Sequence, residues 1–122
     1  MDKKAYITEE EREKCRRVAD AFAELEDVDV VVVDAGRYGF VKLQYYTPPT
    51  GFENDFTFTD SRALFEDLWE EWLHTQLIML ARKMKIEDID YDDIFRQLPE
   101  EKQNELMGRK RHFAEAAGVE IK

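Results

Sequence analysis

The chain has 122 residues, of which 28 are acidic and 18 are basic, so that its formal net charge is −10 and its pI is near 4.7. This length fits one domain, and 43% hydrophobic residues supply enough apolar surface for a folded core. The acidity disfavours nucleic acid and anionic membranes as partners, because both repel a polyanion.

The N-terminus and the cysteine content favour a cytoplasmic protein. The first residues lead into a run of glutamates instead of the apolar stretch of a secretory signal. The longest apolar run, Leu77–Ala81, is too short to span a bilayer. A single cysteine, Cys15, cannot form an internal disulfide, which fits a reducing compartment. We therefore expect a cytoplasmic protein with no membrane partner.

The first predicted element is an amphipathic helix that begins after Thr8. Thr8 and Glu11 have the spacing of a capping box, in which each side chain satisfies a free amide of the first turn. Apolar residues then recur at steps of three and four and form one stripe: Cys15, Val18, Ala19, Phe22 and Leu25.

A three-stranded antiparallel meander is predicted next. The β-branched run 28–33 ends in Asp34-Ala35-Gly36, which is typical of a strand followed by a hairpin turn. The second strand runs from Arg37 to Tyr46 and stops before Pro48-Pro49, since proline cannot donate to the ladder. The third strand lies around Phe56–Thr59.

The alternation of the second strand separates its side chains into two faces. The apolar face consists of Val41, Leu43 and Tyr45. The mixed face consists of Phe40, Lys42, Gln44 and Tyr46. Because the mixed face carries polar groups, we expect it to be half-exposed; the alternative is that the N-terminal or C-terminal helix covers its aromatic residues, since four helices are enough to cover three short strands.

The longest helical pattern runs from about Arg62 to Lys85, after three N-cap candidates at 59–61. Its apolar residues cover an arc of roughly 180°, which is too wide for one neighbour. They are Phe65, Leu68, Trp69, Trp72, Leu73, Leu77, Met79, Leu80 and Met84. We expect Trp69 and Trp72 to be buried, because both lie inside this arc.

Two shorter helices complete the predicted fold. One spans Tyr91–Gln97, and the other spans 99–117 with Gly118 as its C-terminal cap. Gly108 predicts a break or a close contact in the last helix, because glycine there costs about 1 kcal/mol relative to alanine. The predicted fold class is α+β in a single domain, residues 1–122: an N-terminal helix, a three-stranded antiparallel meander, a long helix and two shorter C-terminal helices.

Three segments from the middle of the chain carry a resemblance: Gly39–Tyr46, Phe58–Ser61 and Leu64–Leu73. In these segments the chain resembles small uncharacterised bacterial proteins of similar length. The resemblance implies a bacterial cytoplasmic origin, and it implies no activity and no site residue.

A calcium-loop pattern in the acidic linker is incomplete. Asp88, Asp90 and Asp92 alternate as calcium ligands do, but position six is Asp93 instead of glycine and position twelve is Pro99 instead of glutamate. Capping of the following short helix by Asp90 or Asp92 explains the pattern better.

The catalytic and metal-binding patterns are also incomplete. Glu71 and His74 have the Glu-x-x-His spacing of di-iron bundles, but Arg109 stands three residues before His112, so the second copy is missing. We expect an exposed His74. Cys15 stands in no nucleophile motif, so we predict no catalytic residue, no metal and no cofactor, although carboxylate pairs between distant segments stay open.

The basic cluster at residues 109–112 does not favour nucleic acid. Residues 86–105 contain eight acidic and two basic residues, a local charge of −6 that repels a polyanion. We therefore expect no nucleic-acid partner.

Apolar surface residues are the remaining functional signal, and we predict an interface formed by Phe40, Tyr46, Phe56 and Ile78. The function is then that of a non-catalytic acidic protein that self-associates, as a homodimer, or binds a protein partner. One alternative is a neutralising or inhibitor protein for a basic enzyme or toxin. Another is a small-molecule binder or enzyme with a pocket between the long helix and the sheet.

Overall fold

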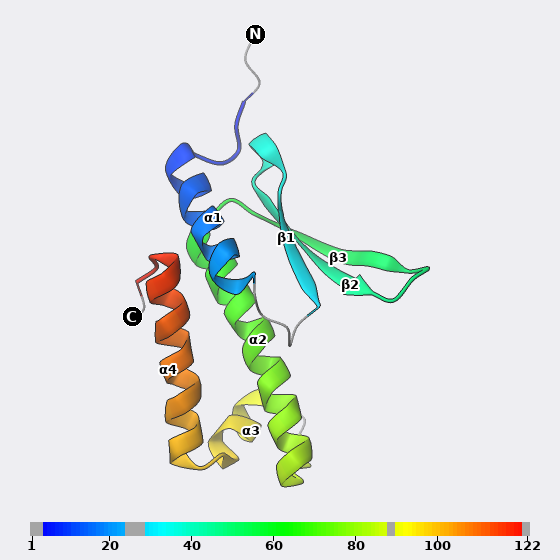
Figure 1. Ribbon diagram of the computed structural model, residues 1–122, viewed down its shortest axis with the longest axis vertical. Coiled ribbons are helices and arrows are strands. Elements are labelled where there is room, and N and C mark those ends of the chain that lie inside the picture. Colours follow the sequence, from blue (N-terminus) through cyan, green and yellow to red (C-terminus); the bar gives the residue numbers. More distant parts are fainter. Residues whose placement is uncertain (1–3, 24–28, 88–89, 121–122) are drawn as a thin grey trace.

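The computed structural model describes residues 4–23, 29–87 and 90–120 (Figure 1). Within these ranges the elements follow the order α1 (Glu9–Phe22), β1 (Val30–Asp34), a 3-10 turn (Gly36–Tyr38), β2 (Phe40–Tyr46), β3 (Gly51–Phe58), α2 (Ser61–Met84), α3 (Tyr91–Gln97) and α4 (Glu100–Ala117). The predicted α+β class and the predicted element order are confirmed. No helix in the described part of the chain is long and apolar enough to cross a membrane.

One of the two predicted capping interactions of α1 is present, and the other is replaced. Thr8 is the N-cap, and its hydroxyl accepts a hydrogen bond of 3.1 Å from the amide of Glu11, as expected. The Glu11 carboxylate, however, accepts hydrogen bonds from the amide of Ser61 at 3.0 Å and from its hydroxyl at 3.2 Å. Glu11 thus connects the start of α1 to the start of α2 instead of closing a capping box. Leu25 lies outside the described residues.

The sheet has the order β1-β2-β3 with antiparallel pairing throughout. β2 begins at Phe40 instead of Arg37, because residues 36–38 form the 3-10 turn and Gly39 follows with a φ of 104°. β3 begins at Gly51, five residues before the predicted start, because β2 and β3 stay paired up to the turn that joins them. Residue 28 of the first predicted strand lies outside the described residues.

All the helices lie on one side of the sheet, with the sheet on one side of α2 and α4 on the other (Figure 1). α2 contacts α1, α3, α4 and β3, so the prediction that it has more than one neighbour is confirmed. Trp69 and Trp72 are buried, as expected from the apolar arc. The exceptions in that arc are Met79 and Met84, which are exposed at the far end of the helix.

The helices cover the mixed face of β2 at its first positions, which is the alternative that the sequence left open. The mixed face points toward the helices, with Phe40 only 3% exposed and Lys42 only 7% exposed. Lys42 tolerates this position because its ammonium donates hydrogen bonds to Asp67 and Glu71 on α2. A buried charge is acceptable where it is paired in this way. The expectation of a half-exposed mixed face is therefore wrong at its first two positions.

The prediction of a break or close contact at Gly108 is wrong. Gly108 lies inside an uninterrupted α4, and a Cβ atom at this position would meet only Nη2 of Arg111, at 3.8 Å. This distance is an ordinary van der Waals contact, and the side chain that makes it is flexible.

Replacing Gly108 by alanine is expected to raise the free energy of unfolding by about 0.5–1 kcal/mol, because alanine loses less backbone entropy in a helix. Urea unfolding followed by circular dichroism measures the change. Gly39→Ala is the contrasting variant: it loses stability, because the φ is 104° and the new Cβ would lie 2.4 Å from the carbonyl oxygen of Phe58. A destabilised Gly108→Ala protein would contradict the finding that the position has room for a methyl group.

Replacing Trp72 by alanine is expected to lower the free energy of unfolding by about 3–5 kcal/mol, the range for emptying a buried aromatic site. The indole packs against Trp69 at 5.3 Å and Phe113 at 5.6 Å between ring centroids. Trp72→Phe keeps most of these contacts and is the milder control. Wild-type stability of Trp72→Ala in urea would show that the residue is no part of the core.

Candidate functional site

The face of the sheet that points away from the helices is rich in apolar side chains. Strand register pairs these side chains across the sheet, and we call them the outer sheet face: Val31, Val33, Val41, Leu43, Tyr45 and Phe52. None of the six packs against the core cluster of the described residues. Four of them are prominently exposed: Val31 by 40%, Val33 by 46%, Tyr45 by 39% and Phe52 by 53%.

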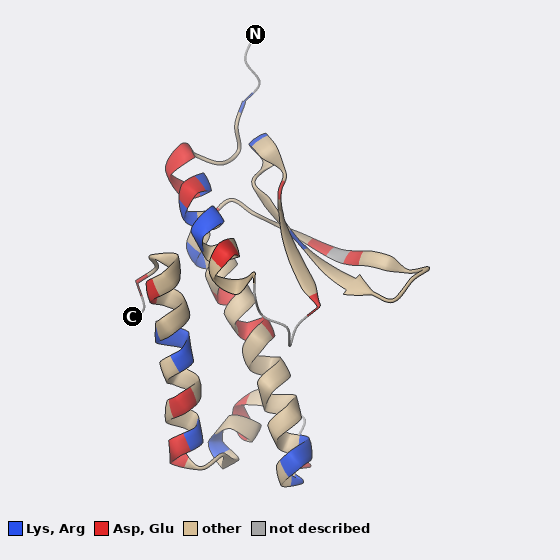
Figure 2. Cartoon of the chain, in the orientation of Figure 1, with Lys and Arg blue, Asp and Glu red and all other residues tan. Residues whose placement is uncertain are grey.

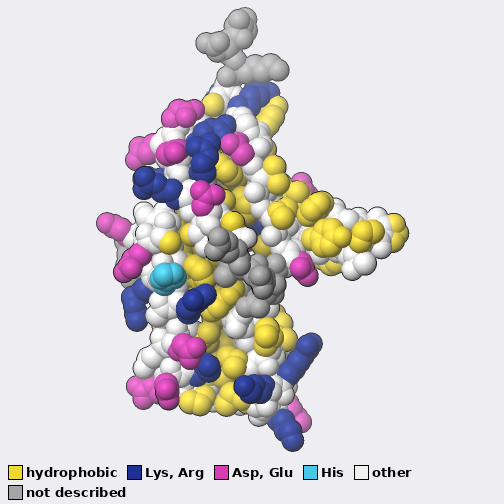
Figure 3. All heavy atoms as spheres, viewed as in Figure 1, with side chains coloured by type: hydrophobic (Ala, Val, Ile, Leu, Met, Phe, Trp, Pro, Cys, Tyr) yellow, Lys and Arg dark blue, Asp and Glu magenta, His cyan; other side chains and the backbone are white. Residues whose placement is uncertain are grey.

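The end of the β2–β3 hairpin extends beyond both β1 and the helices (Figure 1). The register of β1 covers β2 as far as Gln44, and the amide of Tyr45 still donates to the carbonyl oxygen of Asp29 at 2.8 Å, so the end of the hairpin beyond Tyr45 consists of β2 and β3 alone. The rings of Tyr45 and Phe52 meet edge to face at 5.3 Å. Residues 43–52 contain no charged side chain, in a chain in which 38% of residues are charged (Figure 2). Hydrophobic side chains cover the visible side of this hairpin (Figure 3).

The structure does not bring the four predicted interface residues together. Phe40 is buried in the core and offers no surface, so its place in the predicted interface is a correction. Tyr46, Phe56 and Ile78 are exposed, by 41%, 56% and 37%. Phe56 lies on the helix-facing side of the sheet, where Lys42 Nζ is 5.7 Å from its ring, and Ile78 lies on α2.

The sequence did not predict most residues of the outer sheet face as an exposed surface. β1 is apolar at four consecutive positions, Val30–Val33, so alternation alone cannot show which side meets the helices. The uncharged run 43–52 was the available signal, because so long an uncharged stretch in so charged a chain is typical of a surface that contacts protein.

Lys42 is held in an ion-paired site. Its side chain is 8% exposed, and its Nζ lies close to Asp67 and 3.2 Å from Glu71. Burial lowers the pKa of this ammonium, but the hydrogen bonds and charges of Asp67 and Glu71 outweigh burial and raise the pKa. Lys42 therefore stays protonated and paired, which makes it unsuited to act as a nucleophile.

The expectation of an exposed His74 is wrong. His74 is half-buried, and its ring stacks on Tyr91 with centroids 3.8 Å apart and planes 3° apart. The stack forms because α3 folds back against α2, a contact that a helical wheel of α2 cannot reveal. Its partner in the Glu-x-x-His pattern, Glu71, is turned to Lys42. In the part of the chain that the structure describes, no group of three His, Cys, Asp or Glu side chains is placed to hold a metal ion.

The acidic linker caps α3, as the preferred interpretation expected. The Asp90 carboxylate accepts hydrogen bonds from the amides of Asp92 at 2.9 Å and Asp93 at 3.4 Å. Asp88 of the calcium-loop pattern lies outside the described residues.

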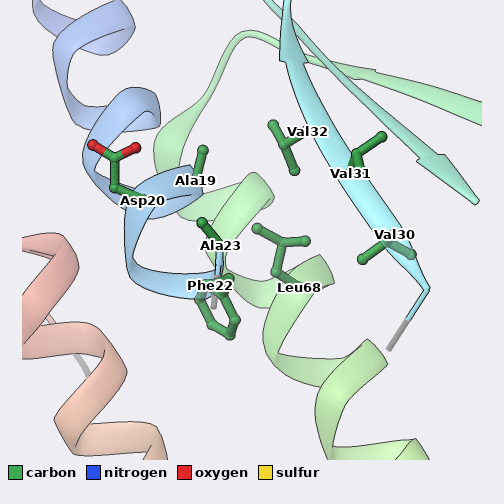
Figure 4. A pocket seen from close by; sticks show the side chains of 8 residues that line it. All are labelled: Ala19, Asp20, Phe22, Ala23, Val30, Val31, Val32 and Leu68. Atoms are coloured by element: carbon green, nitrogen blue, oxygen red, sulfur yellow. The ribbon is translucent and has the colours of Figure 1, made fainter. Parts of the chain in front are cut away.

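A cavity of about 210 Å³ lies between α1, β1 and α2, where the small-molecule alternative places a pocket (Figure 4). Its described lining is Ala19, Asp20, Phe22, Ala23, Val30, Val31, Val32 and Leu68. Asp20 is the one ionisable group of this lining, and its carboxylate is directed away from Val30 and Val32 (Figure 4). The side chain of Val31 points away from the helices, as its place on the outer sheet face requires. Among the described residues, the lining therefore offers apolar contact without a pair of groups for acid–base or nucleophilic chemistry.

Cys15 is completely buried, which confirms the expectation that it packs as a small apolar residue. Burial, followed by the negative charges of Glu11 and Asp60, raises the pKa of the Cys15 thiol to about 11.

The folded protein is expected to resist thiol reagents. At pH 8 a thiol with a pKa of about 11 is about one-thousandth thiolate, and the thiolate is the reactive form. Labelling by a disulfide reagent should thus be at least about a hundredfold slower in the folded protein than in the chain unfolded in guanidinium, with Cys15→Ser as the blank. Rapid stoichiometric labelling of the folded protein would contradict the assigned burial.

Comparison of the chain with models of protein families, with curated proteins and with solved structures finds no match in any of the three.

Proposed function

We propose that this protein is a non-catalytic interaction domain that self-associates through the outer sheet face. The proposal rests on one observation: the helices cover a single face of the sheet, and the uncovered face exposes valine, tyrosine and phenylalanine side chains. Contiguous apolar patches of this kind on a folded protein usually mark an interaction site. A two-stranded ribbon by itself is also only marginally stable in water, so a partner that covers it has a clear benefit.

The size of the patch suits a weak, reversible dimer. The exposed parts of the outer sheet face amount to on the order of 350 Å² per subunit, within the range of functional patches. Two such faces remove on the order of 700 Å² of apolar surface from water, which contributes about 17 kcal/mol at about 25 cal/mol per Å². Association costs about 4–15 kcal/mol. The difference is about 2–13 kcal/mol, and a buried area below about 1,000 Å² is typical of weak, transient interfaces, so we expect a weak dimer.

Charge favours this face as the point of contact between two copies. Each copy has a net charge of −10, so most of the surface of one repels the other. The six residues of the outer sheet face are uncharged, and a face that packs on itself satisfies two-fold symmetry. Sheets pack face to face at a spacing of about 10 Å, which suits valine and aromatic side chains.

A non-catalytic role is supported by the state of the reactive groups. Lys42 is protonated and paired with two carboxylates, and the Cys15 thiol is buried with a raised pKa. Neither group lies at the outer sheet face.

Sedimentation equilibrium from about 1 µM to about 500 µM is expected to show a monomer–dimer equilibrium for the wild type. Val33→Glu and Tyr45→Glu should each raise the dissociation constant at least about tenfold, because a charge would be buried without a partner. Met79→Glu is the matched control: it places the same charge on an exposed residue of α2, 52% exposed, and should leave the dimer intact.

Circular dichroism of each variant verifies that the helices are retained. A wild type that stays monomeric at all these concentrations contradicts the proposal. Equal weakening by Met79→Glu would show that added charge, and not this face, controls association.

A further inference from the structure

A second surface lies among the helices, away from the outer sheet face. It contains a hollow of about 230 Å³ between α2, α3 and α4, lined by Trp69, Leu73, His74, Leu77, Tyr91, Asp92, Phe95 and Met107. We call this hollow the helical groove. Its lining is mainly apolar, with one carboxylate and one imidazole at its side.

The groove is the right size for one apolar side chain. Trp69 and Leu77 are core residues, 3% and 1% exposed, whereas Met107 is 38% exposed. An apolar cavity of about 150 Å³ holds benzene, whereas sites for drug-sized ligands measure about 300–1,000 Å³. A leucine, methionine or phenylalanine side chain therefore fits the groove, and a larger ligand must extend beyond it.

The groove continues into acidic surface. A hollow of about 470 Å³ is lined by Glu70, His74, Asp90, Tyr91 and Asp92. A further hollow of about 150 Å³ is lined by Lys42, Asp67, Glu70, Glu71 and His74. His74 lines all three hollows, and Tyr91 and Asp92 line two of them, so the hollows are neighbours around the stacked His74–Tyr91 rings, and we call them together the depression.

Two of these carboxylates are available to a ligand. Asp67 and Glu71 are engaged by Lys42, and Asp90 caps α3. Glu70 and Asp92 are both exposed, and neither forms a salt bridge with a cation of the described residues. The acidic part therefore attracts a cation and repels an anion.

We propose that this depression binds a basic segment of a protein partner, in which an apolar side chain enters the helical groove and a nearby lysine or arginine pairs with Glu70 and Asp92. A lysine or arginine suits the space between the helical groove and these carboxylates. Its aliphatic stem can pack on the rings of His74 and Tyr91 while its charged end reaches a carboxylate. A small cation alone has no apolar group that could fill the helical groove. The site is distinct from the outer sheet face and does not depend on self-association.

A second copy of this chain is a poor occupant. Of its clustered cations, Arg109 already covers the ring of Phe113 at 5.1 Å and Lys110 already pairs with Glu66 at 3.5 Å. Arg82, Lys83 and Lys85 at the end of α2 are exposed and form no salt bridge among the described residues, so only net charge disfavours this cluster. The net charge of −10 on each copy also opposes contact through an acidic surface.

The probe is a synthetic helical peptide that carries leucine and arginine one turn apart along one face, with alanine elsewhere. Trp69 lines the groove, so tryptophan fluorescence reports binding, and calorimetry verifies the affinity. We expect a dissociation constant of about 10–100 µM at low salt. Peptides with glutamate in place of arginine, or alanine in place of leucine, should bind at least about tenfold more weakly.

Variants of the protein separate the two parts of the site. Glu70→Gln with Asp92→Asn should weaken binding of the arginine peptide at least about fivefold, whereas Glu53→Gln with Glu115→Gln removes the same charge elsewhere and should leave it unchanged. Met107→Lys should weaken binding at least about tenfold, because it places a cation at the mouth of the groove. Each measurement is repeated in the Val33→Glu background, so that failure of self-association does not affect the result.

The proposal is overturned by absence of binding at about 1 mM peptide, which is the weakest affinity of interest. It is also overturned by equal binding of the glutamate peptide, or by equal weakening in the two double variants, since both would mean unspecific charge attraction. A wild-type dimer that dissociates on Met107→Lys without peptide would instead assign the groove to a second copy.

Discussion

The burial of α2 on several sides is the constraint on which the rest of the structure depends. α2 contacts α1, α3, α4 and β3, and it carries much of the buried core, including both tryptophans. To bury this broad apolar arc, the other helices pack around α2, and one side of the sheet packs against it as well. The described residues therefore include no further helix to cover the opposite side of the sheet, which stays open within this part of the chain.

The pairing of Lys42 with Asp67 and Glu71 fixes which side of the sheet meets α2. A lysine whose burial is compensated by two carboxylates can occupy a helix-facing position, so that side of β2 points inward together with Phe40. The outward side then carries Leu43 and Tyr45. Because side chains alternate along a strand, the inward position of Lys42 places the apolar side chains of its neighbours on the outward side.

The outer sheet face and the depression beside α2 and α3 differ in charge. The outer sheet face and the end of the hairpin are uncharged, which suits contact between two acidic copies. The depression beside α2 and α3 combines an apolar groove with free carboxylates, which suits a basic partner. Because the two lie on different elements, one subunit has room for both contacts at once.

The sequence by itself determined the elements, because caps, turn residues and apolar periodicity act over a few residues: Thr8, Asp90 and Gly118 mark helix ends as expected. It also determined the burial of Cys15 and the tryptophans. Only the tertiary structure decided which face of β2 is covered and that His74 stacks on Tyr91. Those features depend on contacts between segments distant in sequence, where an apolar strand or a lone histidine is compatible with either environment until its neighbour is known.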